Sequence, residues 1–74
     1  MREKIKALLE DKLPLVNLDS EYLYRELDSL GVATILMVLS DEFGINLDFK
    51  DATPKNLKNL DSLAEMVNEK IKAE

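Results

Sequence analysis

The residues best suited to chemistry are Asp28-Ser29-Leu30-Gly31, which stand at the head of a long apolar segment with helical spacing. A serine at that place presents its hydroxyl at the N-terminus of a helix. The chain contains no histidine and no cysteine, so neither a Ser-His nor a Cys-His pair is available to activate a nucleophile. The pattern therefore indicates that Ser29 is a point of attachment for another group and not a catalytic residue.

The same composition predicts no metal site and no catalytic residue. Disulfides and zinc sites need Cys or His, and the carboxylates do not follow the spacing of an EF-hand loop. A carboxylate acid–base pair needs a shielded cleft, and 74 residues are too few to build one. The charged start of the chain leads into no apolar run typical of a signal peptide or membrane span. We expect a cytoplasmic protein of one domain, residues 1–74, that is not inserted in a membrane.

The acidic side chains are concentrated around Ser29. The formal charge of the chain is −5, yet residues 19–51 alone hold eight acidic and two basic side chains, a net charge of −6. Such a surface repels phosphate backbones and disfavours nucleic-acid binding. It would attract basic partner surfaces, although acidic surfaces also simply keep small proteins soluble.

Four helical segments are predicted to position Ser29, which makes the fold class an all-α, small four-helix bundle with three main helices and one short helix. The first covers residues 4–12 and ends before Pro14. An apolar connection over residues 14–27 should pack over the core, with a single turn at residues 21–24. The second helix begins at Asp28 or Ser29 and stops at Gly44. A short helix should follow Thr53-Pro54, and the last should begin at Asp61 or Ser62.

The second of these helices is apolar nearly all round, since only Thr34 and Ser40 interrupt it before Asp41. A small bundle cannot surround such a helix, so part of it should face a ligand or a partner protein. Met37 is one such position, with a core gap-filling role as its alternative.

The tripeptide Leu-Asp-Ser occurs three times, ending at Ser20, Ser29 and Ser62. Each copy is explicable as a helix cap, and Ser62 is followed by leucine just as Ser29 is. Ser29 alone precedes the highly apolar helix and lies within the acidic segment.

Three features of the chain occur in this order: Leu27-Asp28-Ser29-Leu30-Gly31, the helix end Asp41-Glu42-Phe43-Gly44-Ile45, and Thr53-Pro54 before a final amphipathic helix. Together they resemble the acyl carrier protein and peptidyl carrier protein family of phosphopantetheine-binding domains. The resemblance covers essentially the whole chain. It implies that Ser29 carries 4′-phosphopantetheine, transferred covalently from coenzyme A by a separate phosphopantetheinyl transferase. The thiol of this arm would then hold an acyl or aminoacyl cargo as a thioester, in a chain that has no thiol of its own.

The resemblance also implies roles for neighbouring residues. Asp28 would help to position magnesium and coenzyme A in the transferase complex, and Leu30 would be a hydrophobic contact beside the prosthetic group and for partners. Further partner contacts would be Met37, Glu26, Asp41 and Glu42. The partners would be the transferase, an acyl- or aminoacyl-loading ligase or acyltransferase, and a downstream synthase or transferase, with the carrier itself a non-catalytic monomer.

The residues after Ser29 differ from those of housekeeping fatty-acid carriers, which display several acidic side chains along this helix. Residues 31–35 are Gly, Val, Ala, Thr and Ile, more like dedicated carriers of polyketide, nonribosomal-peptide or aminoacyl-transfer pathways. The sequence thus favours a stand-alone carrier of such a specialised pathway over one of fatty-acid synthesis. Two other hypotheses remain: a helical interaction module regulated by phosphorylation of Ser29, and a structural domain that dimerises through the apolar helix.

Overall fold

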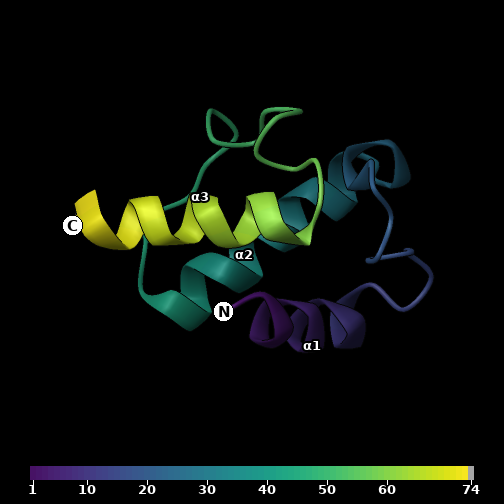
Figure 1. The fold of residues 1–74 in the computed structure, drawn as a ribbon, viewed down its shortest axis with the longest axis horizontal. Coiled ribbons are helices and arrows are strands. Elements are labelled where there is room, and N and C mark those ends of the chain that lie inside the picture. Colours follow the sequence, from purple (N-terminus) through teal and green to yellow (C-terminus); the bar gives the residue numbers. More distant parts are fainter. Residues whose placement is uncertain (74) are drawn as a thin grey trace.

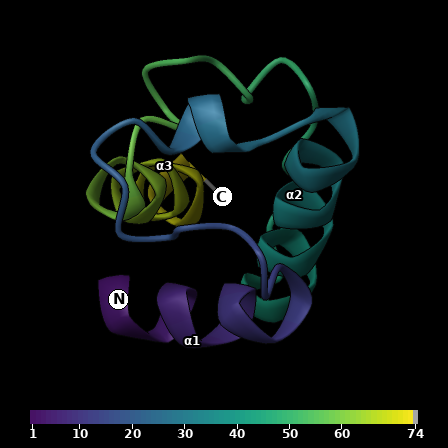
Figure 2. The same ribbon diagram turned by 90° about the vertical axis from the view of Figure 1, so that its right-hand side faces the viewer.

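The computed structural model describes residues 1–73, and regular structure within them is entirely helical. Its elements are α1 (Arg2–Lys12), the short 3₁₀ helix η1 (Leu23–Glu26), α2 (Ser29–Phe43) and α3 (Leu60–Ala73) (Figure 1). In Figure 2, α3 is seen almost end-on, with α1 running across below it and α2 standing beside it. The predicted all-α bundle of three main helices and one short helix is therefore confirmed.

The C-terminal end of α1 and both ends of α2 follow from local sequence, as predicted, whereas α1 begins at Arg2, two residues before the predicted start. The first helix ends at Lys12, because Leu13 precedes a proline and leaves the helical region. Asp28 is the N-cap of α2 and Gly44 ends it in the left-handed conformation, with φ 62°. Glycine adopts this conformation without the steric cost that a Cβ would add.

The short helix predicted after Thr53-Pro54 is wrong: residues 54–57 form a turn, and the short helix of the bundle is η1 instead. Thr53 does act as a cap, since its Oγ1 accepts from the amide of Asn56 at 3.1 Å. The carbonyl of Asn56, however, accepts from the Ser62 hydroxyl at 2.8 Å. This side-chain contact replaces the backbone bond that would continue a helix, so the segment stops after one turn.

The helix α3 begins at Leu60, one or two residues before the predicted start at Asp61 or Ser62, because Asn59 is its cap. Asn59 Oδ1 accepts from the Ser62 amide at 2.9 Å, and the Ser62 hydroxyl accepts from the Asn59 amide at 3.0 Å. These reciprocal bonds satisfy two amides that would otherwise lack partners and form a capping box.

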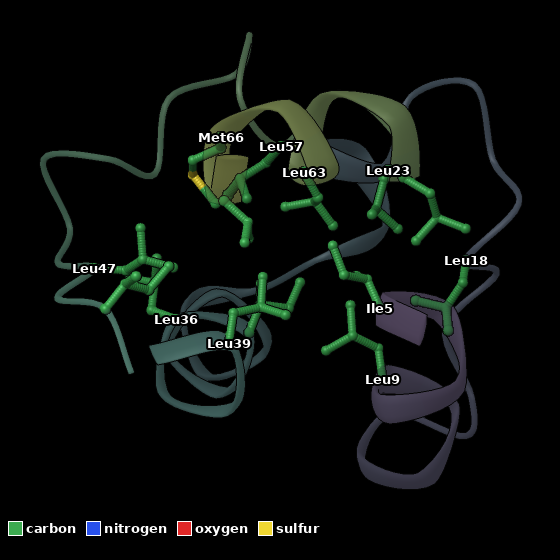
Figure 3. Packing of buried hydrophobic residues seen from close by; sticks show 14 residues of the cluster. Ile5, Leu9, Leu18, Leu23, Leu36, Leu39, Leu47, Leu57, Leu63 and Met66 are labelled. Carbon is green, nitrogen blue, oxygen red and sulfur yellow. The ribbon is translucent and has the colours of Figure 1, made fainter. Parts of the chain in front are cut away.

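Leucines and isoleucines from every element meet in one core, shown in Figure 3. The side chains with 0% exposure are Ile5, Leu9, Leu23, Ile35, Leu39, Leu57, Leu63 and Val67. Met66 and Leu63 of α3, together with Leu57, face Leu36 and Leu39 of α2 across this core in the view of Figure 3. Within residues 1–73 no helix is long and apolar enough to cross a membrane.

The connection between α1 and α2 packs on the core as predicted through Leu18 and Leu23, which are 5% and 0% exposed. Two of its apolar residues do not follow the prediction. Leu15 is 98% exposed, because a turn closed by the Val16 amide and the Leu13 carbonyl at 3.2 Å places it on the outside. Tyr22 is 53% exposed.

Candidate functional site

Ser29 is the first residue of α2, and its side chain is exposed. Asp28 precedes it in an extended conformation and accepts from the Gly31 amide through Oδ1 at 2.8 Å. The first intrahelical bond joins the Val32 amide to the Asp28 carbonyl at 3.0 Å. Since Asp28 caps the helix, the Ser29 hydroxyl is not needed for capping and stands at the positive end of the helix dipole.

Gly31 has a packing role that its conformation alone does not reveal. A Cβ at this position would lie 3.2 Å from Leu27 Cδ2 and 3.3 Å from Asp28 Oδ1. Both distances are tighter than ordinary van der Waals contacts. Glycine therefore lets Leu27 and the capping carboxylate approach the first turn of the helix, and this approach sets the position of Ser29.

The structure separates the three Leu-Asp-Ser copies by what the serine oxygen does. Ser20 Oγ accepts from the Tyr22 amide at 3.1 Å. Ser62 Oγ accepts from the Asn59 amide, and its single proton is shared between the carbonyl oxygens of Asn56 and Asn59, each 2.8 Å away. Only in the copy at Ser29 is the cap carried by the aspartate. Ser20 and Ser62 are thus engaged in the fold, whereas Ser29 combines exposure with a helix N-terminus.

Three of the predicted partner contacts share one exposed face of α2. Met37 and Asp41 follow Leu30 by seven and eleven positions, about two and three helical turns, so the three side chains lie on nearly the same side of the helix. Leu30 is 75% exposed and Met37 is 57% exposed, so Met37 is not a core gap-filler. Some of the apolar side chains of α2, the helix that begins at Ser29, are therefore exposed on the protein surface.

Glu26 and Glu42 lie away from that face. Glu26 is an exposed residue at the end of η1, close before Asp28. Glu42 Oε2 forms an ion pair with Lys4 Nζ of α1 at 3.2 Å. The structure thus gives Glu42 a role between α1 and α2, and a partner would meet it already paired.

Two open hollows lie on either side of Asp28. The first, which we name the Leu15 hollow, measures about 530 Å³ and is lined in part by Leu15, Glu26, Asp28 and Leu30. The second, the Phe49 hollow, measures about 420 Å³. Its lining consists of Tyr24, Leu27, Asp28, Ser29, Val32, Phe49 and Ala52.

Sequence reasoning did not single out Leu15, Tyr24 or Phe49, which line these hollows. Phe49 is 65% exposed and Tyr24 is 41% exposed. The sequence did contain one signal for Phe49: it is an aromatic residue within the polar run Asp48-Phe49-Lys50-Asp51, where the hydrophobic pattern does not assign it to the core. Periodicity could not show that this run returns to the start of α2.

The residues around Ser29 fit a phosphodiester attached to its oxygen. The first turn of α2 contains no acidic side chain, and the carboxylate of the preceding residue, Asp28, accepts from the Gly31 amide through Oδ1 at 2.8 Å. The amides of the first two helical residues precede the first intrahelical bond and remain available to an anion. The surface beside Ser29 is open on the Phe49 side.

Comparison with known families agrees with this geometry. The chain matches the family model described as "Phosphopantetheine attachment site" over residues 2–67. It therefore belongs to the phosphopantetheine-binding carrier family, as the sequence resemblance predicted. Carrier domains of this family bear 4′-phosphopantetheine and are generally non-catalytic. Neither a curated protein nor a solved structure was found to match the chain.

Proposed function

We propose that Ser29 is the attachment site of 4′-phosphopantetheine and that the chain carries an acyl or aminoacyl cargo as a thioester on this arm. The observation that supports the proposal best is the exposure of Ser29 at the N-terminus of α2, with Asp28 supplying the cap in its place. The other two serines of the Leu-Asp-Ser copies have oxygens that bond to the backbone.

Within this proposal the chain presents an oxygen and positions it. The Ser29 oxygen would form the new bond to phosphorus as coenzyme A loses its adenosine bisphosphate portion. Asp28 caps the helix through Oδ1 and the chain has no histidine to serve as a base, so we assign removal of the serine proton to the transferase. The prosthetic group, once bound, supplies the thiol that the chain lacks.

The exposed face of α2 supports a specialised pathway over fatty-acid synthesis. Leu30 and Met37 are exposed apolar residues, and the first acidic residue on their face is Asp41. Partner enzymes would therefore recognise this face mainly through apolar contact. Acidic side chains at Glu26, Asp28 and Asp41 would supply attraction from the rim, with a loading ligase or acyltransferase and a downstream synthase or transferase as the partners.

The test is the intact mass of the protein after incubation with coenzyme A, magnesium and a broad-specificity phosphopantetheinyl transferase. We expect the mass of one phosphopantetheine to be added to the wild type and to Ser20→Ala, and none to be added to Ser29→Ala. Ser20 is the matched control because it ends another Leu-Asp-Ser and its hydroxyl holds only a local turn. Modification of the Ser29→Ala variant would refute the assignment. So would an unmodified wild-type protein whose far-UV circular dichroism spectrum shows that it is folded.

A further inference from the structure

The Phe49 hollow begins at Ser29 itself. Ser29 is one of its lining residues, whereas the Leu15 hollow is lined by Asp28 and Leu30 without Ser29. A group tethered to the Ser29 oxygen therefore starts beside the Phe49 hollow and has a high effective concentration there. The hollow needs only weak affinity to hold the first part of such a group.

Phe49 is exposed, yet its backbone is held in place. It occupies a turn in which the Asp51 amide donates to the Asp48 carbonyl at 2.9 Å and Asp51 Oδ2 accepts from the Asp48 amide at 3.1 Å. Asp51 Oδ1 also pairs with Lys70 Nζ of α3 at 3.2 Å. The turn is thus fastened to the bundle, and it presents an aromatic ring that the core does not use.

Tyr24 reaches the same hollow from η1. This short helix is anchored by Leu23, which is 0% exposed and whose amide donates to the carbonyl of Lys58. Tyr24 itself is 41% exposed. Two segments far apart in the sequence therefore each contribute one partly exposed aromatic residue beside Ser29. Leu27, Val32 and Ala52 add apolar side chains to a lining that also includes Asp28.

The two hollows have the same formal charge of −1 and differ in how many charged and aromatic side chains line them. Asp28 is the only ionisable carboxylate that lines the Phe49 hollow, and its Oδ1 already accepts from the Gly31 amide. The Leu15 hollow adds Glu26 and Lys12, together with two highly exposed leucines. An apolar group linked to a phosphodiester is better matched by the aromatic hollow, with the phosphate left at the helix N-terminus.

We propose, on the basis of the function proposed above, that Phe49 and Tyr24 form a resting site for the proximal end of the 4′-phosphopantetheine arm. In this arm a CH₂ group joins the phosphate oxygen to a quaternary carbon that has two methyl groups. These methyl groups pack against the two rings. The arm is held along the side of η1 and the residue 48–51 turn, and the face with Leu30 and Met37 stays open for partner enzymes.

The test is proton NMR of the protein after modification at Ser29 has been verified by mass. Ring currents shield protons above an aromatic face, so we expect the two methyl resonances to lie upfield of their positions in coenzyme A. We also expect nuclear Overhauser contacts from these methyls to the ring protons of Phe49 or Tyr24. In Phe49→Ala most of the upfield shift should be lost, and this variant should fold because Phe49 is not part of the core.

Leu15→Ala is the matched control, since it removes an exposed apolar side chain from the other hollow. Its methyl resonances should stay at the wild-type positions. Methyl resonances at the coenzyme A positions in modified wild type, with no contact to either ring, would overturn the resting site while leaving the attachment intact. Absence of any mass gain in the folded wild type would instead remove the attachment proposal and, with it, the resting site.

Discussion

Asp28 combines two separable roles, a structural one seen in the fold and a recognition role expected from the resemblance to carriers. Its Oδ1 accepts from the Gly31 amide at 2.8 Å. Replacing an N-cap aspartate by alanine costs about 1 kcal/mol, within a range of about 0.5–2 kcal/mol. For a domain of this size, we expect Asp28→Ala to lower the melting temperature by about 4–8 °C.

Asp28→Asn separates the two roles. Asparagine caps helices about as well as aspartate, so this variant should lose only the attraction between a carboxylate and the helix N-terminus, about 0.3–1 kcal/mol. If Asp28 also positions magnesium and coenzyme A in the transferase complex, the asparagine variant should be modified nearly as slowly as the alanine variant. Thermal unfolding followed by circular dichroism and the initial rate of mass gain measure the two roles independently.

Asp61→Ala is the control, because Asp61 lies in the second Asp-Ser-Leu but does not cap α3. Its Oδ1 pairs with Arg2 Nε at 3.0 Å, and the side chains are 78% and 40% exposed. Surface pairs of this kind contribute about 0–1 kcal/mol, so Asp61→Ala should melt close to the wild type and be modified at its rate. An Asp28→Ala variant as stable as Asp61→Ala would refute the capping argument. An Asp28→Asn variant modified at the wild-type rate would refute the recognition role.

Two further predictions concern the frame of the site. Gly44 has φ 62°, a left-handed conformation that a residue with a Cβ adopts only at a cost, although a Cβ there would meet nothing within 4 Å. Gly44→Ala should therefore lower the free energy of unfolding in urea by about 1–2 kcal/mol. Gly44→Asn should lower it less, and equal losses in the two variants would contradict this explanation. Asp19 raises the pKa of Lys6 above 10.5, first through a hydrogen bond and then through its charge. A raised pKa stabilises the fold below the unfolded value and loses that effect as the pH rises through the folded value. The difference in melting temperature between wild type and Lys6→Met should therefore be constant near neutral pH and shrink only above pH 10.5; a difference that shrinks below pH 9 would contradict it.

The parts of the fold that depend on neighbouring residues were predictable from the sequence. Pro14 ends α1, Asp28 begins α2 and Gly44 ends it, because each effect acts through the residue's own backbone or through an amide one turn away. The position of Ser29 at a helix N-terminus follows from the same local rules. The family was predicted from the resemblance of the sequence motifs, and the match over residues 2–67 confirms it.

The parts that depend on distant residues were not predictable. The Ser62 hydroxyl reaches back to the carbonyl of Asn56, where a short helix was expected and a turn is found, and Asn59 rather than Asp61 or Ser62 caps α3. Local propensity cannot anticipate that competition, because it arises only when the two segments meet.

The surroundings of Ser29 divide in the same way. The sequence by itself determined a serine at the head of an apolar helix, since capping and periodicity are written in consecutive residues. Only the tertiary structure decided that Asp28 would take the cap and that Phe49 and Tyr24 would reach the same hollow as Ser29. Leu23 is buried in η1 and Asp51 pairs with Lys70 of α3, so both segments that meet beside Ser29 are in contact with the bundle.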